Sequence, residues 1–169
     1  PSSAASDVYK RQDVRILDGG LENWLAHGYQ TLTGPGNIAV GSKFEVTPGQ
    51  LPTAMIDDVR EHEGVLIDTR SSNRFAGRRE NLDLKAGHIP GAVNVPERLF
   101  HNDGVHTLKT PDEIREVLAA AGLTQENTKD AIIYSGSGNH SALALAAMED
   151  AGFTGLRHYI GGWSQWSAD

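Results

Sequence analysis

Short apolar segments alternate with helical segments along most of the chain, and this alternation is the feature that most constrains the fold. Val65-Leu66-Ile67 stands between Gly64 and Asp68, and an apolar triplet bounded in this way is typical of a parallel strand covered on both faces. A helix is predicted between an N-cap at Thr110 and a stop at Gly122. Other predicted strands are 43–46, 92–95, 131–134 and 156–160, and other predicted helices are about 51–63 and 141–150. This spacing predicts an α/β fold around a parallel sheet.

The N-terminal part of the chain has a different organisation. Residues 1–12 are Ser/Ala-rich and then charged, without periodicity, so we expect a disordered leader, cloning scar or assembly artefact. The next residues predict a short strand at 14–17, a turn at 18–20 and a helix at 21–27 that Gly28 ends. Thr-Gly-Pro-Gly at 33–36 has the composition of a linker. We therefore expect a boundary at 31–42, followed by a complete domain at 43–169.

Composition excludes several kinds of function. A net charge of −7 and a pI near 5.4 argue against a nucleic-acid or anionic-membrane surface, which needs clustered Lys and Arg. No apolar run approaches the roughly 20 residues of a membrane span, so a cytoplasmic protein is expected. The absence of cysteine excludes disulfides, thiolate metal sites and persulfide chemistry. The seven histidines are scattered, with His101 and His106 expected at the surface, and no metal or cofactor is predicted.

Three separated motifs resemble the rhodanese family of sulfurtransferases, and together they span nearly all of 44–169. The most specific is Asp68-Thr69-Arg70, followed by Arg74-Phe75 and by the run 87–96, which begins Gly-His-Ile-Pro-Gly-Ala. The strand and loop 134–138, Tyr-Ser-Gly-Ser-Gly, is similar to the Cys-Gly-Ser-Gly loop of mercaptopyruvate and thiosulfate sulfurtransferases. The tail 159–166 is similar to the closing strand and short helix of the family. The resemblance implies a rhodanese-like fold, a central parallel sheet of about five strands with helices on both faces.

The same family accounts for the N-terminal part, because residues 16–24 repeat the closing pattern of 159–166 before the linker. Two-domain sulfurtransferases carry two rhodanese modules in tandem. The resemblance therefore implies that 13–30 is the remnant of a first module and 43–169 the C-terminal module. In tandem members the pocket lies where the modules meet, so the implied partner is a missing N-terminal module, or a second copy of the chain through self-association.

A Gly-rich turn between the end of a strand and the start of a helix favours an anion site, whatever the family. Several backbone N–H groups can point inward there, and the helix dipole stabilises an anion by about 0.3–1 kcal/mol. In the family this loop lowers the pKa of the nucleophilic cysteine and then holds its persulfide. By resemblance, the anion-binding loop consists of Gly136, Ser137, Gly138, Asn139 and His140. A protonated His140 would add positive charge.

Ser135 stands at the position of the attacking cysteine. A serine hydroxyl is far harder to deprotonate than a thiol, whose reference pKa is about 8.5. Oxygen also cannot hold the transferred sulfur as a stable persulfide, so we expect this chain to be inactive in the family's reaction. The serine was introduced to silence or trap an enzyme, or the protein is a natural pseudoenzyme.

The resemblance also implies substrates and further site residues. The family passes sulfane sulfur from a small anionic donor, thiosulfate or 3-mercaptopyruvate, to a thiol or cyanide acceptor. Arg74 matches an arginine that contacts the substrate carboxylate; a second arginine does not align, and Arg78 or Arg79 could replace it. Asp68 is expected to hydrogen-bond loop amides or Arg70, or to be an ordinary strand-end carboxylate.

At several positions a structural role competes with a functional one. His88 is expected to shape a turn rather than act as a base, and Trp163 and Trp166 to close an edge of the core. The segment 136–141 differs from a dinucleotide-binding turn, because it lacks the third glycine of that motif. A serine hydrolase would need Gly-x-Ser-x-Gly, and a related phosphatase an arginine where Ser141 stands. The main alternative is a natural noncatalytic rhodanese-like module that binds anions or proteins.

Overall fold

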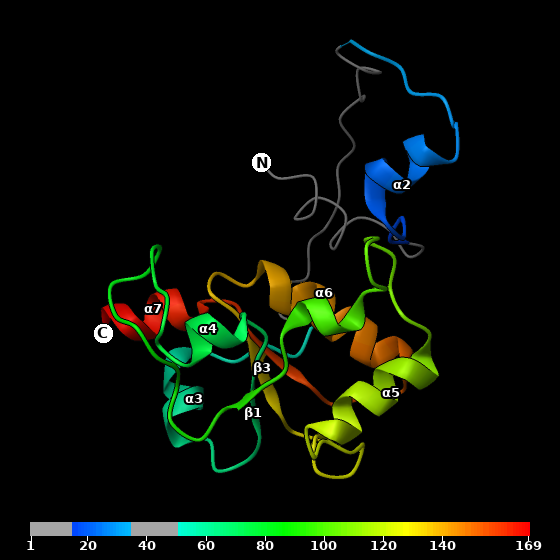
Figure 1. Ribbon diagram of the computed structural model, residues 1–169. Helices are drawn as coiled ribbons and strands as arrows, with labels where there is room; N and C mark the ends of the chain where they lie inside the picture. The colour runs from blue at the N-terminus through cyan, green and yellow to red at the C-terminus, as the bar shows by residue number, and fades with distance from the viewer. Residues whose placement is uncertain (1–14, 35–50) are drawn as a thin grey trace, which may run out of the picture. The chain divides into compact units, whose positions relative to one another are not determined.

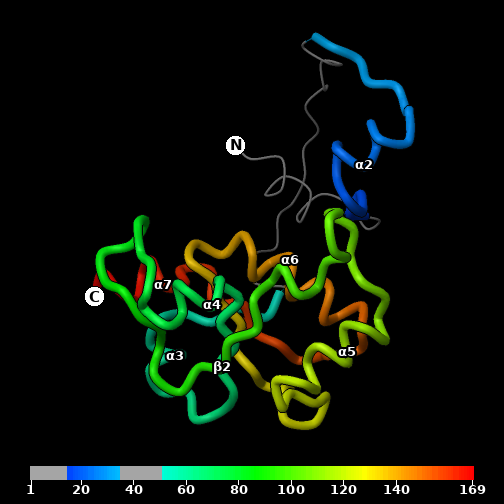
Figure 2. Tube along the Cα trace, in the orientation of Figure 1, coloured from blue at the N-terminus to red at the C-terminus, as the bar shows by residue number. Residues whose placement is uncertain are grey.

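The computed structural model describes residues 15–34 and 51–169, drawn in colour in Figures 1 and 2. The chain divides into two compact units: residues 1–50 with the loop 103–107, and residues 51–102 with 108–169. The first unit contains the helix α2 (Gly20–Ala26), which confirms the helix predicted at 21–27. Gly28 follows it with a positive φ of 75°, the left-handed backbone conformation that commonly ends a helix.

The second unit is built on a parallel sheet of four strands. They are β1 (Leu66–Asp68), β2 (Val93–Asn94), β3 (Ile132–Tyr134) and β4 (Arg157–Tyr159). Their order is β2-β1-β3-β4 and every pair is parallel. The sheet confirms the predicted α/β class and comes close to the expected five strands. The remaining predicted strand, 43–46, falls outside the described residues.

Both faces of the sheet are covered by buried side chains. Neighbouring residues of a strand point to opposite sides, so each strand contributes to both faces. Ile67 and Ile133 belong to one core cluster, and Leu66 and Ile132 belong to the other. The first cluster includes residues of α5 (Pro111–Ala120) and α6 (Asn139–Asp150). The second includes residues of α3 (Ile56–Glu61) and α7 (Gly162–Ala168). Figure 1 shows α5 and α6 on one side of the strands and α3 and α7 on the other. The short helices α4 (Ser72–Phe75) and η1 (Glu97–Phe100) follow β1 and β2.

Two predicted elements differ from the structure. Residues 15–17 form no strand in the described part of the chain, because a strand needs a neighbour to complete its hydrogen bonds and no described strand pairs with them. The helix predicted from about residue 51 begins only at Ile56, since Thr53 forms a parallel bridge to His158 at the edge of the sheet. The cap predicted for α5 is confirmed, with Thr110 and Glu113 forming a capping box.

The described helices include none that is long and apolar enough to cross a lipid bilayer.

Candidate active site

The loop 135–138 connects the buried strand β3 to α6, and Ser135 is its first residue. The Ser135 side chain is completely buried. Its Oγ accepts a hydrogen bond from the Gly138 N–H at 3.1 Å and lies 3.1 Å from the Ser141 Oγ, which donates to it. Side chains on the outer face of the loop are exposed, namely those of Ser137, Asn139 and His140. A ligand can therefore approach the loop, but it reaches the Ser135 oxygen only if the loop moves.

The start of α7 orients the loop peptides. The Trp163 N–H donates to the Ser135 carbonyl at 2.8 Å, and the Ser164 N–H donates to the Gly136 carbonyl at 2.9 Å. No described peptide is cis, so each amide N–H points away from the carbonyl of the preceding residue. The N–H groups of Gly136 and Ser137 consequently point away from α7. At the other end of the loop, the first N–H groups of α6 have no acceptor within the helix.

Two glycines are required by this geometry. Gly138 has a φ of 84°, and a Cβ there would lie 3.0 Å from the Ile160 carbonyl oxygen. Gly162 has a φ of 56°, and a Cβ there would lie 2.4 Å from the Ser135 carbonyl oxygen. Both positions combine a left-handed backbone with a close approach, which only glycine tolerates.

Behind the loop, Ser141 connects residue 135 to a histidine of β4. The Ser141 Oγ is buried and lies 2.8 Å from the His158 Nε2. The Ser141 Oγ also lies 3.0 Å from the Gly138 carbonyl oxygen, which is an alternative acceptor for its single hydrogen. Burial lowers the pKa of His158, and a backbone contact with Gly138 only partly opposes this shift. His158 is therefore neutral near pH 7.

Arg74 lies beside the loop, where the sequence predicts a substrate contact. A Cβ added to Gly136 would lie 3.3 Å from the Arg74 Nη1. The guanidinium is paired with Glu80, at 3.0 Å, and with Asp83, at 2.5 Å. Desolvation raises the pKa of Glu80, but hydrogen bonds from Arg74 and from backbone amides bring it below its ordinary value. Two carboxylates of the chain thus occupy the arginine expected to bind a substrate carboxylate.

The two other candidate arginines are exposed. The Arg78 Nε donates to the Asn73 Oδ1 at 3.2 Å, and its backbone N–H, like that of Arg79, bonds to the Asn73 carbonyl.

Asp68 and Arg70 form a buried ion pair. Their side chains are 0% and 1% exposed, and the Arg70 Nη2 lies 2.7 Å from the Asp68 Oδ2. Arg70 also donates to the Gly87 carbonyl at 2.6 Å, and its guanidinium carbon lies 4.8 Å from the Trp163 ring centroid. Of the alternatives considered for Asp68, the structure favours the bond to Arg70. The pair joins the end of β1 to the Gly-His-Ile-Pro-Gly-Ala turn.

His140 leans toward η1 rather than into the loop. Its Nδ1 lies 3.4 Å from the Glu97 Oε2, and Glu97 also pairs with His101. His88 has the structural role expected of it, since its Nδ1 bonds to the Phe75 carbonyl at 2.8 Å and its ring stacks on Phe75. Trp163 is buried in the core, as predicted.

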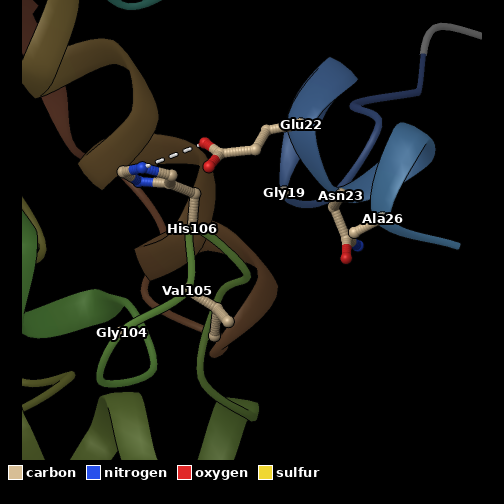
Figure 3. A pocket seen from close by; sticks show the side chains of 7 residues that line it. All are labelled: Gly19, Glu22, Asn23, Ala26, Gly104, Val105 and His106. Carbon is tan, nitrogen blue, oxygen red and sulfur yellow. Dashed lines mark ion pairs between the residues drawn. The ribbon is translucent and has the colours of Figure 1, made fainter.

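The first unit contains a pocket of its own. Figure 3 shows Glu22, Asn23 and His106 among its lining residues, with Glu22 and His106 forming an exposed ion pair at 3.5 Å. None of the predicted site residues lines this pocket.

Sequence analysis missed Ser141, His158, Glu80 and Asp83. His158 lies 23 residues after Ser135, and only the pairing of β3 with β4 brings it near the loop. The pairing of Glu80 and Asp83 with Arg74 could have been predicted, because the sequence places two acidic residues shortly after that arginine.

Comparison with known proteins agrees with the fold and the motifs. The rhodanese-like domain family matches residues 51–169. A "Putative thiosulfate sulfurtransferase" of Saccharopolyspora erythraea is 30% identical over 172 residues, covering 95% of this chain and 60% of its own length. A "Probable 3-mercaptopyruvate sulfurtransferase" of Pseudomonas aeruginosa is 32% identical over 167 residues, covering 95% of this chain and 57% of its own length. The structure of 3-mercaptopyruvate sulfurtransferase from Leishmania major superposes with a TM-score of 0.76 at 24% identity, covering 89% of this chain and 42% of that one.

The chain belongs to the rhodanese-like domain family, whose model matches well over half of it. Its relatives carry the names of thiosulfate and 3-mercaptopyruvate sulfurtransferases. The chain spans about 60% of the length of the curated relatives it matches.

Proposed function

We propose that this chain is a sulfurtransferase module whose catalytic step is blocked at Ser135. The active form of the module would move sulfane sulfur from thiosulfate or 3-mercaptopyruvate to a thiol or cyanide acceptor. The observation that carries the proposal is the position of Ser135, buried at the start of the loop between β3 and α6 and hydrogen-bonded to the Gly138 N–H. An N–H donor at the γ atom stabilises a thiolate in a cysteine enzyme.

The blocked step follows from elementary chemistry. In the family's reaction with thiosulfate, a thiolate attacks the outer sulfur, a new S–S bond forms, and sulfite leaves with the electrons of the broken bond. Ser135 offers a hydroxyl of much higher pKa than a thiol, and oxygen gives no stable persulfide to pass on. Residues 136–140 would hold the anionic donor, with Arg74 beside them and Asp68 and Arg70 supporting the loop.

Donor selection would depend on Arg74. Since Glu80 and Asp83 already pair with its guanidinium, a carboxylate donor such as 3-mercaptopyruvate must displace them. Thiosulfate carries no carboxylate and can use the loop amides alone. Both donors therefore belong in the test.

We also propose that the module is the C-terminal one of a tandem pair in the cytoplasm, with residues 13–30 closing a first module. The alignments to relatives cover 95% of the chain, more than the matched family region 51–169. The N-terminal module of such a pair, or a second copy of the chain, would complete the pocket.

The test is turnover after Ser135→Cys. The variant is incubated with thiosulfate and cyanide, and separately with 3-mercaptopyruvate and a thiol, and thiocyanate or pyruvate is measured. We expect turnover with at least one donor in Ser135→Cys and none in the unchanged chain or in Ser135→Ala. A folded Ser135→Cys chain that turns over neither donor would contradict the proposal.

The second candidate is a natural noncatalytic module. It is favoured by the complete burial of Ser135 and by its two hydrogen bonds, which fit a hydroxyl at this position. Calorimetric titration of the unchanged chain with thiosulfate, with turnover monitored in parallel, separates the two. Binding without turnover, together with an inactive Ser135→Cys variant, would favour this candidate.

A further inference from the structure

We propose that Ser141 and His158 form a proton relay that accepts the proton of the side chain at position 135. The relay consists of the Ser141 hydroxyl and the His158 imidazole, and it supplies the base that a cysteine at this position needs. This inference rests on the proposed sulfurtransferase function and adds positioning residues to it. Neither Ser141 nor His158 belongs to the motifs that carry the family resemblance.

The geometry of the Ser141 hydroxyl is that of a relay. Its oxygen lies 3.1 Å from the Ser135 Oγ and 2.8 Å from the His158 Nε2, so one group connects the two others. A hydroxyl has one proton to donate and two lone pairs that accept. It can therefore accept a proton from residue 135 while it donates its own to the imidazole.

The proton step balances without any outside reactant. The γ atom of residue 135 gives its proton to the Ser141 Oγ, and the Ser141 proton moves to the His158 Nε2. The products are an anion at position 135 and an imidazolium at His158, with the Ser141 hydroxyl restored. That hydroxyl and the Gly138 N–H then both donate to the anion, each from 3.1 Å.

His158 is suited to act as the base at the end of this relay. Burial lowers its pKa, so the ring is neutral near pH 7, and an anion formed at position 135 would stabilise its protonated form. Which ring nitrogen carries the hydrogen depends on its partners; with the hydrogen on Nδ1, the Nε2 lone pair faces Ser141. The backbone N–H of His158 donates to the Pro52 carbonyl at 2.9 Å, which fixes the residue at the edge of the sheet.

Charges near the relay are compensated by close partners. On the outer side of the loop, the Arg74 guanidinium is paired with Glu80 and Asp83. At the start of α6, His140 faces Glu97. On β4 itself, Arg157 pairs with Asp58 at 2.8 Å. This leaves His158 as the ionisable group that is hydrogen-bonded to residue 135 through another side chain, the Ser141 hydroxyl.

The experiment uses the pKa of a single thiol in the full chain. Because the chain contains no cysteine, Ser135→Cys introduces the only one, and its thiolate absorbance in the ultraviolet can be followed against pH. This optical signal needs no reagent to enter the buried site. We expect the thiol to titrate below its reference pKa of about 8.5 in Ser135→Cys.

Variants of the relay are then made in the Ser135→Cys background. His158→Gln removes the base and Ser141→Ala removes the connection, and each is expected to raise the thiol pKa by about one unit or more, a tenfold loss of thiolate near neutral pH. Ser141→Thr keeps a hydroxyl and should restore the lower value. Ser167→Ala, a buried hydroxyl of α7, and His106→Gln, an exposed imidazole, are matched controls that should leave the thiol pKa unchanged.

A second measurement views the same coupling from the imidazole. In NMR titrations, the pKa of His158 should be higher in Ser135→Cys than in the unchanged chain, because a thiolate stabilises the imidazolium. This comparison needs neither relay variant, so it decides the question even if those variants do not fold.

Equal thiol pKa values in Ser135→Cys, Ser135→Cys/His158→Gln and Ser135→Cys/Ser141→Ala would overturn the relay, as would an unchanged His158 titration. Neither measurement involves a sulfur donor. A lowered thiol pKa without sulfur turnover would therefore support the relay and contradict the proposed function, whereas turnover with an unperturbed thiol would do the reverse.

Discussion

At the scale of single residues, the buried pair of Asp68 and Arg70 shows how the candidate active-site loop is supported. The Asp68 carboxylate accepts hydrogen bonds from the Arg70 guanidinium and from the Arg70 backbone N–H, the latter at 2.8 Å. Arg70 in turn fixes the Gly87 carbonyl and packs over Trp163. One pair thus connects β1, the turn before β2 and the start of α7.

Arg70→Met is expected to destabilise the protein by about 3–5 kcal/mol, because it leaves the Asp68 carboxylate buried without its partner. Urea unfolding measures this free energy. Lys129→Met, which removes an exposed pair with Glu126, is the control and should cost at most about 1 kcal/mol. Equal effects of the two substitutions would show that the buried Asp68–Arg70 pair contributes no more to the free energy of unfolding than an exposed pair does.

Glu80 gives a prediction for pH. Its pKa is lowered from 4.5 in the folded protein, so its ionised form stabilises the fold above the pKa of the unfolded chain. This contribution is lost as the pH falls through the lower, folded pKa. The free energy of unfolding should therefore decrease below about pH 4.5, and less steeply in Glu80→Gln. Parallel pH curves for the two proteins would contradict the pairing with Arg74.

At the scale of elements, the loop between β3 and α6 depends on a glycine that starts the helix. Gly138→Ala is expected to destabilise the protein through its left-handed backbone, at about 1–2 kcal/mol, and further through its approach to the Ile160 carbonyl. Gly122→Ala is the matched control, since Gly122 has a φ of 75° with no atom within 4 Å of an added Cβ. Thermal unfolding should show the larger loss for Gly138→Ala. An equal loss would mean that the close approach is relieved without cost.

The elements differ in how well the sequence predicted them. The strands β1 and β3 and the helix α5 were found because their signals are local: an apolar triplet, an N-cap and a glycine after the helix. The predicted start of α3 was wrong because Thr53 forms a bridge to His158, and a pairing between residues so far apart in the chain leaves no local signal. The contact between Ser141 and His158 was not predicted for the same reason, because strand pairing and the first turn of α6 bring the two residues together.

At the scale of the whole molecule, the two core clusters lie entirely within residues 51–169. We therefore expect a chain of residues 43–169, which keeps the predicted first strand, to unfold cooperatively at the same temperature as the full chain. Calorimetry of both proteins tests this. A clearly lower midpoint for the shorter chain would show that the N-terminal part contributes to the stability of the rhodanese-like domain.

We propose above all that the oxygen at position 135 prevents this chain from taking up sulfane sulfur. Mass spectrometry of the intact Ser135→Cys chain, after incubation with thiosulfate or 3-mercaptopyruvate, tests it most directly. The claim predicts the gain of one sulfur atom that cyanide or a reductant removes, and no gain by the unchanged chain under the same conditions. A folded Ser135→Cys chain that gains no sulfur from either donor would contradict it.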